Sequence, residues 1–265
     1  MAALISANLH LLLAFIPPVL WLLFYLREDR HPEPKLLIIL ALVGGMASAF
    51  LAMLAELLAL GHEGVFAGIF SLDSSPLIFF LIIAFIEEYV KYLPVKFLVT
   101  SRKEFDEPVD GMIYMMTAAL GFAALENALF AFPFFFSMAE NVISILPLTQ
   151  ESLFMSLDVA TNRFLGANLL HALSSGIVGF FLARAWFHPH RHHFVGLGIV
   201  LATILHAVFN YFILVREVIP QGTFYIIMLL AVMAVMVFID FERLKKQKVI
   251  DKTGGPEEKL EHPNI

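Results

Sequence analysis

The chain has 265 residues, of which 60% are hydrophobic and 15% charged, and its formal net charge is −6. Soluble domains are about 45–50% apolar and about 25% charged, so this composition argues against a soluble globular domain and against a disordered chain. The acidic balance lacks the basic footprint of nucleic-acid-binding proteins, so no nucleic-acid partner is expected. The absence of cysteine excludes disulfides, thiolate metal sites and cysteine nucleophiles.

Seven apolar segments are each long enough to cross a bilayer, which requires roughly 20 residues. In chain order they are predicted over residues 4–26, 36–60, 77–98, 111–136, 162–187, 194–215 and 220–239. Short polar stretches join most of them, and a longer link covers residues 137–161. The sequence therefore predicts an all-α polytopic membrane protein. One membrane-embedded domain is expected over residues 1–240, and a charged tail over residues 241–265.

The Lys and Arg residues alternate between loops and so indicate the orientation of the chain. Residues 27–35 contain three, residues 100–110 contain two, and the tail contains six, whereas residues 61–76 and 137–161 contain none. Because cytoplasmic loops carry the positive charge, the N-terminus is expected outside and the C-terminus in the cytoplasm. An odd number of spans, such as seven, satisfies this orientation.

Ionisable and amide side chains interrupt four of the predicted spans, where such groups are costly and usually functional. They are Glu87, Glu88 and Lys91 in the third span, Glu126 and Asn127 in the fourth, Asn168 and His171 in the fifth, and His206 and Asn210 in the sixth. At about 1.5 Å per residue, Glu87, Glu126 and the two histidines lie roughly 13–15 Å from the outer helix ends. They are therefore predicted to form one polar centre near the middle of the membrane.

Two spacings place polar side chains of this centre on one helix face. Glu87 and Lys91 are four residues apart and can pair, so Lys91 is expected to act as a counter-ion. His206 and Asn210 are likewise one turn apart. The asparagines of the fourth and fifth spans are expected to support the centre. A lone polar residue in a membrane helix is often only a contact between helices, so the functional interpretation depends on the combination.

The predicted centre is suited to several kinds of chemistry. Two adjacent carboxyls in a low dielectric resist ionising together, so Glu87 or Glu88 can act as a base that deprotonates water. Glu87 is the preferred base because Lys91 shares its face. His206 and Asn210 can then hydrogen-bond a developing oxyanion. The same residue types also match a proton or cation pathway through the membrane.

A zinc version of the centre uses the same residues, because two histidines and a glutamate match a catalytic zinc site. The candidate ligands are His171, His206 and Glu126. We prefer the metal-free version, since adjacent carboxyls beside a lysine already supply a base. In addition, no span carries the two-histidine turn common in zinc proteases. Apart from zinc, no cofactor is expected.

Two other features are interpreted as structural. Glu56 lies near the outer end of the second span and is expected to be interfacial. Gly44-Gly45, Gly176 and Gly179 are expected to permit close packing between helices.

Taken together in order, several motifs resemble those of the PrsW family of intramembrane proteases, a CAAX-protease-like group. They are Glu87-Glu88-x-x-Lys91, Gly121-Phe122-Ala123-Ala124-Leu125-Glu126-Asn127, His171, His206-x-x-x-Asn210, and the pairs Glu33-Pro34 and Asp110-Gly111. The resemblance covers about residues 29–210. In the CAAX branch an Arg stands one position later than Lys91, and a Phe stands at the position of Ala167. Both departures favour PrsW over the prenyl-processing enzymes.

The resemblance implies a bacterial cell membrane protease that cuts a single-pass membrane protein, such as an anti-sigma factor, near its extracytoplasmic side. It implies that Glu87 and Glu88 supply the base and that Glu126, His171 and the His206–Asn210 pair complete the site. The lipid bilayer is the other expected partner. Two alternatives stay open from the residues themselves. One is a proton-coupled transporter or channel, and the other is a catalytically silent membrane scaffold.

Overall fold

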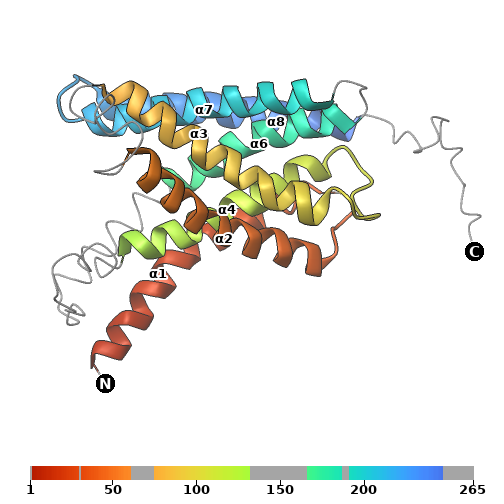
Figure 1. Ribbon diagram of the computed structural model, residues 1–265, viewed down its shortest axis with the longest axis horizontal. Helices are drawn as coiled ribbons and strands as arrows, with labels where there is room; N and C mark the ends of the chain where they lie inside the picture. Colours follow the sequence, from red (N-terminus) through yellow and green to blue (C-terminus); the bar gives the residue numbers. More distant parts are fainter. Residues whose placement is uncertain (1, 30, 61–74, 132–165, 187–190, 247–265) are drawn as a thin grey trace, which may run out of the picture.

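The computed structural model describes residues 2–29, 31–60, 75–131, 166–186 and 191–246, and these parts of the chain are helical with no strand. The helices are α1 (Ala2–Tyr25), α2 (Lys35–Leu60), α3 (Pro76–Pro94) with its π-helical continuation η1 (Val95–Val99), α4 (Asp110–Ala131), α6 (Ala167–Trp186), α7 (Arg191–Val215) and α8 (Gly222–Lys245) (Figure 1). The all-α class is confirmed. Each predicted span coincides with one of these helices, apart from its ends.

Some predicted boundaries differ from the structure or lie beyond it. Residues 132–136, residues 162–165 and the link over 137–161 lie outside the described residues. Helix α8 continues past the predicted end at residue 239 and ends at Lys245. It continues because Phe241 and Leu244 are buried in the main hydrophobic cluster. The first charged residues after position 240 are therefore part of a packed helix, and the cytoplasmic tail stays a prediction.

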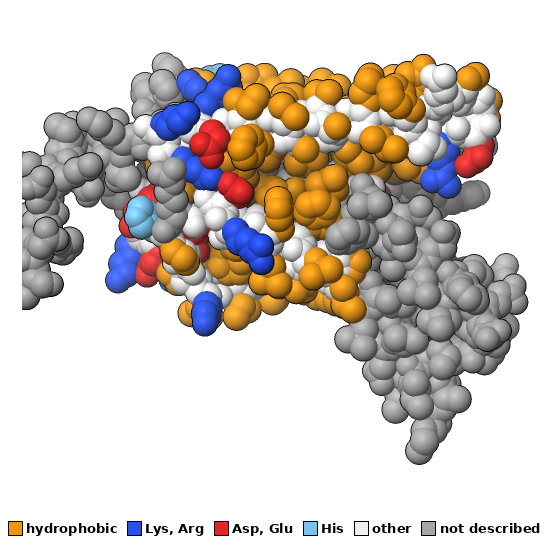
Figure 2. Space-filling view, turned by 180° about the vertical axis from the view of Figure 1, so that it is seen from behind, with side chains coloured by type: hydrophobic (Ala, Val, Ile, Leu, Met, Phe, Trp, Pro, Cys, Tyr) orange, Lys and Arg blue, Asp and Glu red, His pale blue; other side chains and the backbone are white. Residues whose placement is uncertain are grey.

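Four of the described helical stretches are long and apolar enough to cross a membrane. They are Lys35–Leu60, Asp110–Leu129, His193–Val215 and Gly222–Lys245. Large apolar side chains are exposed along α2, α7 and α8. Figure 2 shows such side chains covering much of one face, with charged side chains gathered mainly toward its ends. These features fit a multi-pass membrane protein, while the count of seven spans and the orientation stay predictions.

Helix α4 is the central helix of the described bundle. It packs against α1, α2 and α6, and nearly all its side chains are buried. Small residues make this possible: a methyl group added at Gly45 would lie 1.9 Å from the carbonyl oxygen of Ala118. One added at Gly121 would lie 2.0 Å from that of Leu42. The helix backbones therefore touch, as in other membrane bundles whose interfaces are rich in small residues.

This contact predicts that Gly45→Ala destabilises the fold by about 3 kcal/mol, at the upper end of the usual cost of overpacking, because backbone must move. Gly196→Ala is the matched control, since nothing lies within 4 Å of a methyl group added there. The measurement is thermal unfolding of both variants in detergent. Equal stability of the two variants would contradict the close contact between α2 and α4.

The Glu33-Pro34 and Asp110-Gly111 pairs meet at one end of the bundle. Tyr114 on α4 donates a hydrogen bond to the Glu33 carboxylate, and Asp110 accepts two backbone hydrogen bonds from the loop before α4. Burial raises the pKa of the Glu33 carboxyl, while its hydrogen bond with Tyr114 opposes that shift. A methyl group at Gly111 would lie 2.8 Å from the carbonyl oxygen of Gly179. These motif residues thus hold two parts of the molecule against the start of α4: the segment that precedes α2, and helix α6 itself.

Candidate active site

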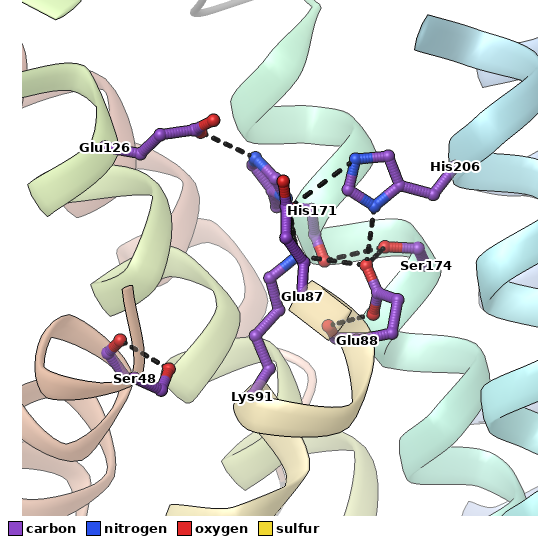
Figure 3. Close-up of polar contacts among 10 residues, drawn as sticks. Ser48, Glu87, Glu88, Lys91, Glu126, His171, Ser174 and His206 are labelled. Carbon is purple, nitrogen blue, oxygen red and sulfur yellow. Dashed lines mark hydrogen bonds and ion pairs between the residues drawn. The ribbon is translucent and has the colours of Figure 1, made fainter. Parts of the chain in front are cut away.

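Four helices contribute side chains to one buried polar cluster (Figure 3). Helix α3 provides three of them, two glutamates and a lysine. The glutamates stand four and three positions before the lysine, so both carboxylates lie on the helix face of that lysine. The other three come from α4, α6 and α7. In chain order the members are Glu87, Glu88, Lys91, Glu126, His171 and His206. The structure therefore brings together all the acids and imidazoles that were expected at one depth.

Lys91 is the cation at the centre of this cluster. Its Nζ donates to Glu87 Oε2 at 3.3 Å, to Glu88 Oε1 at 3.0 Å and to His171 Nδ1 at 2.7 Å. The side chain is fully buried. An ammonium has three hydrogens and no acceptor, so these three contacts use its whole donor capacity. Lys91 thus has the predicted role of counter-ion and also joins α3 to α6.

The two adjacent glutamates have different surroundings. Glu88 is fully buried and accepts hydrogen bonds from Ser174 Oγ, Ser175 Oγ and His206 Nδ1, each at 2.9 Å, in addition to Lys91. These four donors fix the position of the Glu88 carboxylate, which in turn orients the His206 ring. The two serines are site residues that the sequence analysis did not identify.

His171 has both ring nitrogens engaged. Its Nδ1 accepts from the Lys91 ammonium, which fixes the neutral tautomer with a hydrogen on Nε2. That Nε2 donates to Glu126 Oε2 at 2.9 Å. His171 therefore links the central lysine to the carboxylate of α4, and Glu126 acts here as the partner of an imidazole.

Glu87 presents its Oε2 between the two imidazoles. This oxygen lies 3.6 Å from His206 Nε2 and 3.8 Å from His171 Nδ1, so neither ring makes a direct hydrogen bond to it. Lys91 is its ion-pair partner. Unlike Glu88, Glu87 also lines a cavity, so its carboxylate is the member of the adjacent pair that a water molecule or a substrate can reach.

The cavity has a volume of about 770 Å³ and is mostly apolar. Its polar lining includes Glu87, Glu126, His171, His206 and Asn210. Aromatic and aliphatic side chains such as those of Phe80, Phe122, Phe209 and Ile226 form most of the wall. Apolar walls around a few convergent polar groups are typical of a binding site.

The remaining supporting residues lie apart from the cavity. Asn127 Nδ2 donates to Asn168 Oδ1 at 2.9 Å and to the carbonyl oxygen of Ala14 at 3.1 Å. Both asparagines are buried and do not line the cavity. Their contacts join α4 to α6 and to α1, as expected of interhelical hydrogen bonds.

Glu56 is a residue whose environment the sequence interpretation missed. It was expected at the membrane interface, but it lines the same cavity as Glu87 and Glu126. Its Oε1 is buried and has no hydrogen-bond partner among the described residues. A signal was present, because an acid inside an otherwise apolar helix of 26 residues is itself unusual.

Three side chains among the described residues have the types and spacing of a metal site. One ligand atom from each of Glu87, His171 and His206 lies within 4.8 Å of the other two. The carboxylate in this group of possible metal ligands is therefore Glu87 and not, as the sequence had predicted, Glu126. Glu126 is instead hydrogen-bonded to His171. The residue types fit zinc, but Lys91 already occupies His171 Nδ1 and Glu87 Oε2, so a metal ion there would meet an ammonium. The arrangement that Lys91 holds therefore does not fit a metal ion.

The family model of the PrsW family intramembrane metalloproteases matches residues 33–238. The chain belongs to the PrsW family. Protease PrsW of Geobacillus kaustophilus is 31% identical over 195 residues, which are 73% of this chain and 74% of that protein. Protease PrsW of Clostridioides difficile is 27% identical over 247 residues, 90% and 92% of the two chains. Protease PrsW of Bacillus subtilis is 27% identical over 190 residues, which are 71% of this chain and 74% of that protein. No solved structure matches the chain.

As a PrsW-family member, the protein is an intramembrane protease, a hydrolase that acts on a membrane protein within a lipid bilayer. This places it in the protease class and not among the transporters and channels weighed as alternatives. The matched region contains every residue of the polar cluster. The family is described as one of metalloproteases, so the metal-free preference needs a direct test.

Proposed function

We propose that this protein cleaves a single-pass membrane protein near the extracytoplasmic side of the membrane, with Glu87 activating the attacking water. The observation that supports this role is the position of Glu87: it lines the cavity, pairs with Lys91 and lies between two imidazoles. The substrate proposed is an anti-sigma factor, as the family resemblance implies. The bacterial cell membrane is the proposed location.

In the proposed reaction, the Glu87 carboxylate takes a proton from water while the water oxygen attacks the carbonyl carbon of the scissile bond. The carbonyl electron pair moves to its oxygen and forms a tetrahedral oxyanion. When this intermediate collapses, the C–N bond breaks and the proton held by Glu87 passes to the leaving amine. One water is consumed, and the products are a new carboxyl end and a new amine end.

His206 and Asn210 are proposed to stabilise the oxyanion. Because Glu88 accepts from His206 Nδ1, a protonated His206 still has a donor at Nε2, which faces the Glu87 side of the cluster. Asn210 lies one turn further along α7 and lines the same cavity, so its amide supplies a second donor. Donors held in place before the reaction stabilise the developing charge without reorganisation.

The proposed mechanism needs no metal, because Lys91 already supplies the positive charge beside Glu87. We expect the purified protein, prepared without a His-tag, to cut a candidate anti-sigma factor at an unchanged rate after treatment with a strong chelator. Mass spectrometry identifies the cut, and elemental analysis measures zinc. Stoichiometric zinc, together with activity that a chelator removes and added zinc restores, would require the metal version instead.

The proposed topology places the N-terminus outside and residues 100–110 in the cytoplasm. Because the chain has no cysteine, single cysteines can report each side without background. Lys103 lies in the loop between η1 and α4, Val218 lies in the turn between α7 and α8, and both are well exposed. We expect an impermeant thiol reagent applied to intact cells to label Val218→Cys and not Lys103→Cys. The reverse pattern would invert the topology and contradict an extracytoplasmic cut.

A further inference from the structure

Glu56 is a cavity-lining carboxylate that the proposed mechanism does not use. It comes from α2, whereas the cluster residues come from α3, α4, α6 and α7. Its Oε1 is shielded from solvent and has no hydrogen-bond partner among the described side chains and backbone. A buried carboxylate oxygen without a donor is costly, so a ligand that supplies a donor gains the corresponding free energy.

The charge around Glu56 favours a cation as that ligand. Glu126 is near enough for the two carboxylates to repel each other. Lys91 cannot donate to either, because its hydrogens are directed at Glu87, Glu88 and His171. The cavity wall also includes Arg216, whose charge is offset by its ion pair with the neighbouring Glu217. An ammonium or guanidinium in the cavity would offset the negative charge of Glu56 and donate to its Oε1.

The position of Glu56 relative to Glu87 indicates which part of a substrate it meets. Glu56 is four residues from the end of α2, and Glu87 is 11 residues from the start of α3. These two helix ends lie on the same side of the predicted membrane. At about 1.5 Å per residue, Glu56 is roughly 10 Å nearer that side than Glu87. An extended peptide rises about 3.3 Å per residue, so this distance corresponds to about three residues.

We propose that Glu56 binds a lysine or arginine side chain of the substrate, about three residues from the scissile bond on the outer side. Glu56 is then a specificity residue that selects the substrate and the bond that is cut. This inference rests on the proposed function, because it takes Glu87 as the position of the reacting bond. The cationic side chain enters between Glu56 and Glu126 and donates to the Glu56 oxygen that has no partner.

The test uses synthetic 24-residue Leu/Ala peptides in detergent micelles, each with a central Gly pair and one Lys, Gln or Glu moved through its outer half. Chelator is present throughout, which excludes bridging by a metal. Two quantities are measured: kcat/KM by mass spectrometry, and the Kd for the inactive Glu87→Gln protein by fluorescence anisotropy. The second quantity does not depend on catalysis.

We expect the best Lys peptide to be cut at least about tenfold faster than its Gln counterpart, and bound at least about tenfold tighter, as for a hydrogen bond to a charged group. Glu56→Gln, which keeps the shape of the side chain, should bring both ratios to about one. Glu56→Lys should favour the Glu peptide. Glu104→Gln is the matched control, because it removes a carboxylate of the loop before α4 that does not line the cavity, and it should leave both ratios unchanged.

The outcomes separate this inference from the proposed function. No Lys preference at any position, or a preference that survives Glu56→Gln, would overturn the role of Glu56 while cleavage itself still supports a protease. Binding that prefers Lys and depends on Glu56, with no peptide cut, would support the role of Glu56 and count against the reaction proposed for Glu87. Gel filtration of each variant verifies that the protein is folded.

Discussion

Glu87→Gln is expected to lower the rate of substrate cleavage by about 10²–10⁴-fold, the contribution typical of a general base. The amide has the same shape as the carboxylate but cannot take a proton from water. The protein should stay folded, because among the described residues Glu87 makes one direct hydrogen bond, to Lys91 at 3.3 Å, and Lys91 keeps its contacts with Glu88 and His171. Initial rates with a candidate anti-sigma factor, measured by mass spectrometry, give the effect.

Glu217→Gln serves as the control for removal of a carboxylate, since Glu217 is 84% exposed and lies away from the polar cluster. It should cut at the wild-type rate. A Glu87→Gln protein that cuts as fast as this control would exclude Glu87 as the base. Glu126 would then be the candidate base, because it also lines the cavity and bonds to His171.

The second large effect is expected at Lys91. Lys91→Met keeps most of the side-chain volume but leaves the buried carboxylates of Glu87 and Glu88 without their cation, and it leaves His171 Nδ1 without a donor. Breaking a buried ion pair by removing one partner typically costs about 3–5 kcal/mol. We therefore expect a large loss of folded protein, measured by thermal unfolding in detergent and by recovery from the membrane.

Lys96→Met is the matched control, because Lys96 lies five residues further along the chain, in η1, and is exposed. It should unfold at nearly the wild-type temperature. If both variants unfold together, Lys91 is not the central cation of the cluster. The argument against a metal ion at Glu87 and His171 would then lose its basis.

The membrane-helical class and most helix positions follow from the sequence alone. Apolar runs of about 20 residues predict membrane helices regardless of what they pack against, since every backbone polar group in lipid must be satisfied within the helix. Helix ends were harder to predict, because packing decides them. Helix α8, for example, extends to Lys245 because Phe241 and Leu244 are buried in the main hydrophobic cluster.

The membership of the polar cluster was also accessible from the sequence. Ionisable residues in apolar spans must find one another or water, and Glu87, Glu126, His171 and His206 were expected at one depth. The structure places them in contact or within a few ångströms. Their catalytic roles rest on the proposal above and on the tests of Glu87 and of the metal.

What the sequence by itself determined is thus the helical membrane class, the polar residues that meet, and the motifs of the PrsW family. Only the tertiary structure decided which way each side chain faces. Glu87 lines the cavity and Glu88 does not, although they are neighbours, and Glu56 faces the cavity and not the interface. The physical reason is that lipid and the bundle interior are both apolar, so hydropathy does not reveal the rotation of a helix about its axis. That rotation is set by contacts with neighbouring helices, such as the backbone contact at Gly45 and the three hydrogen bonds of Lys91.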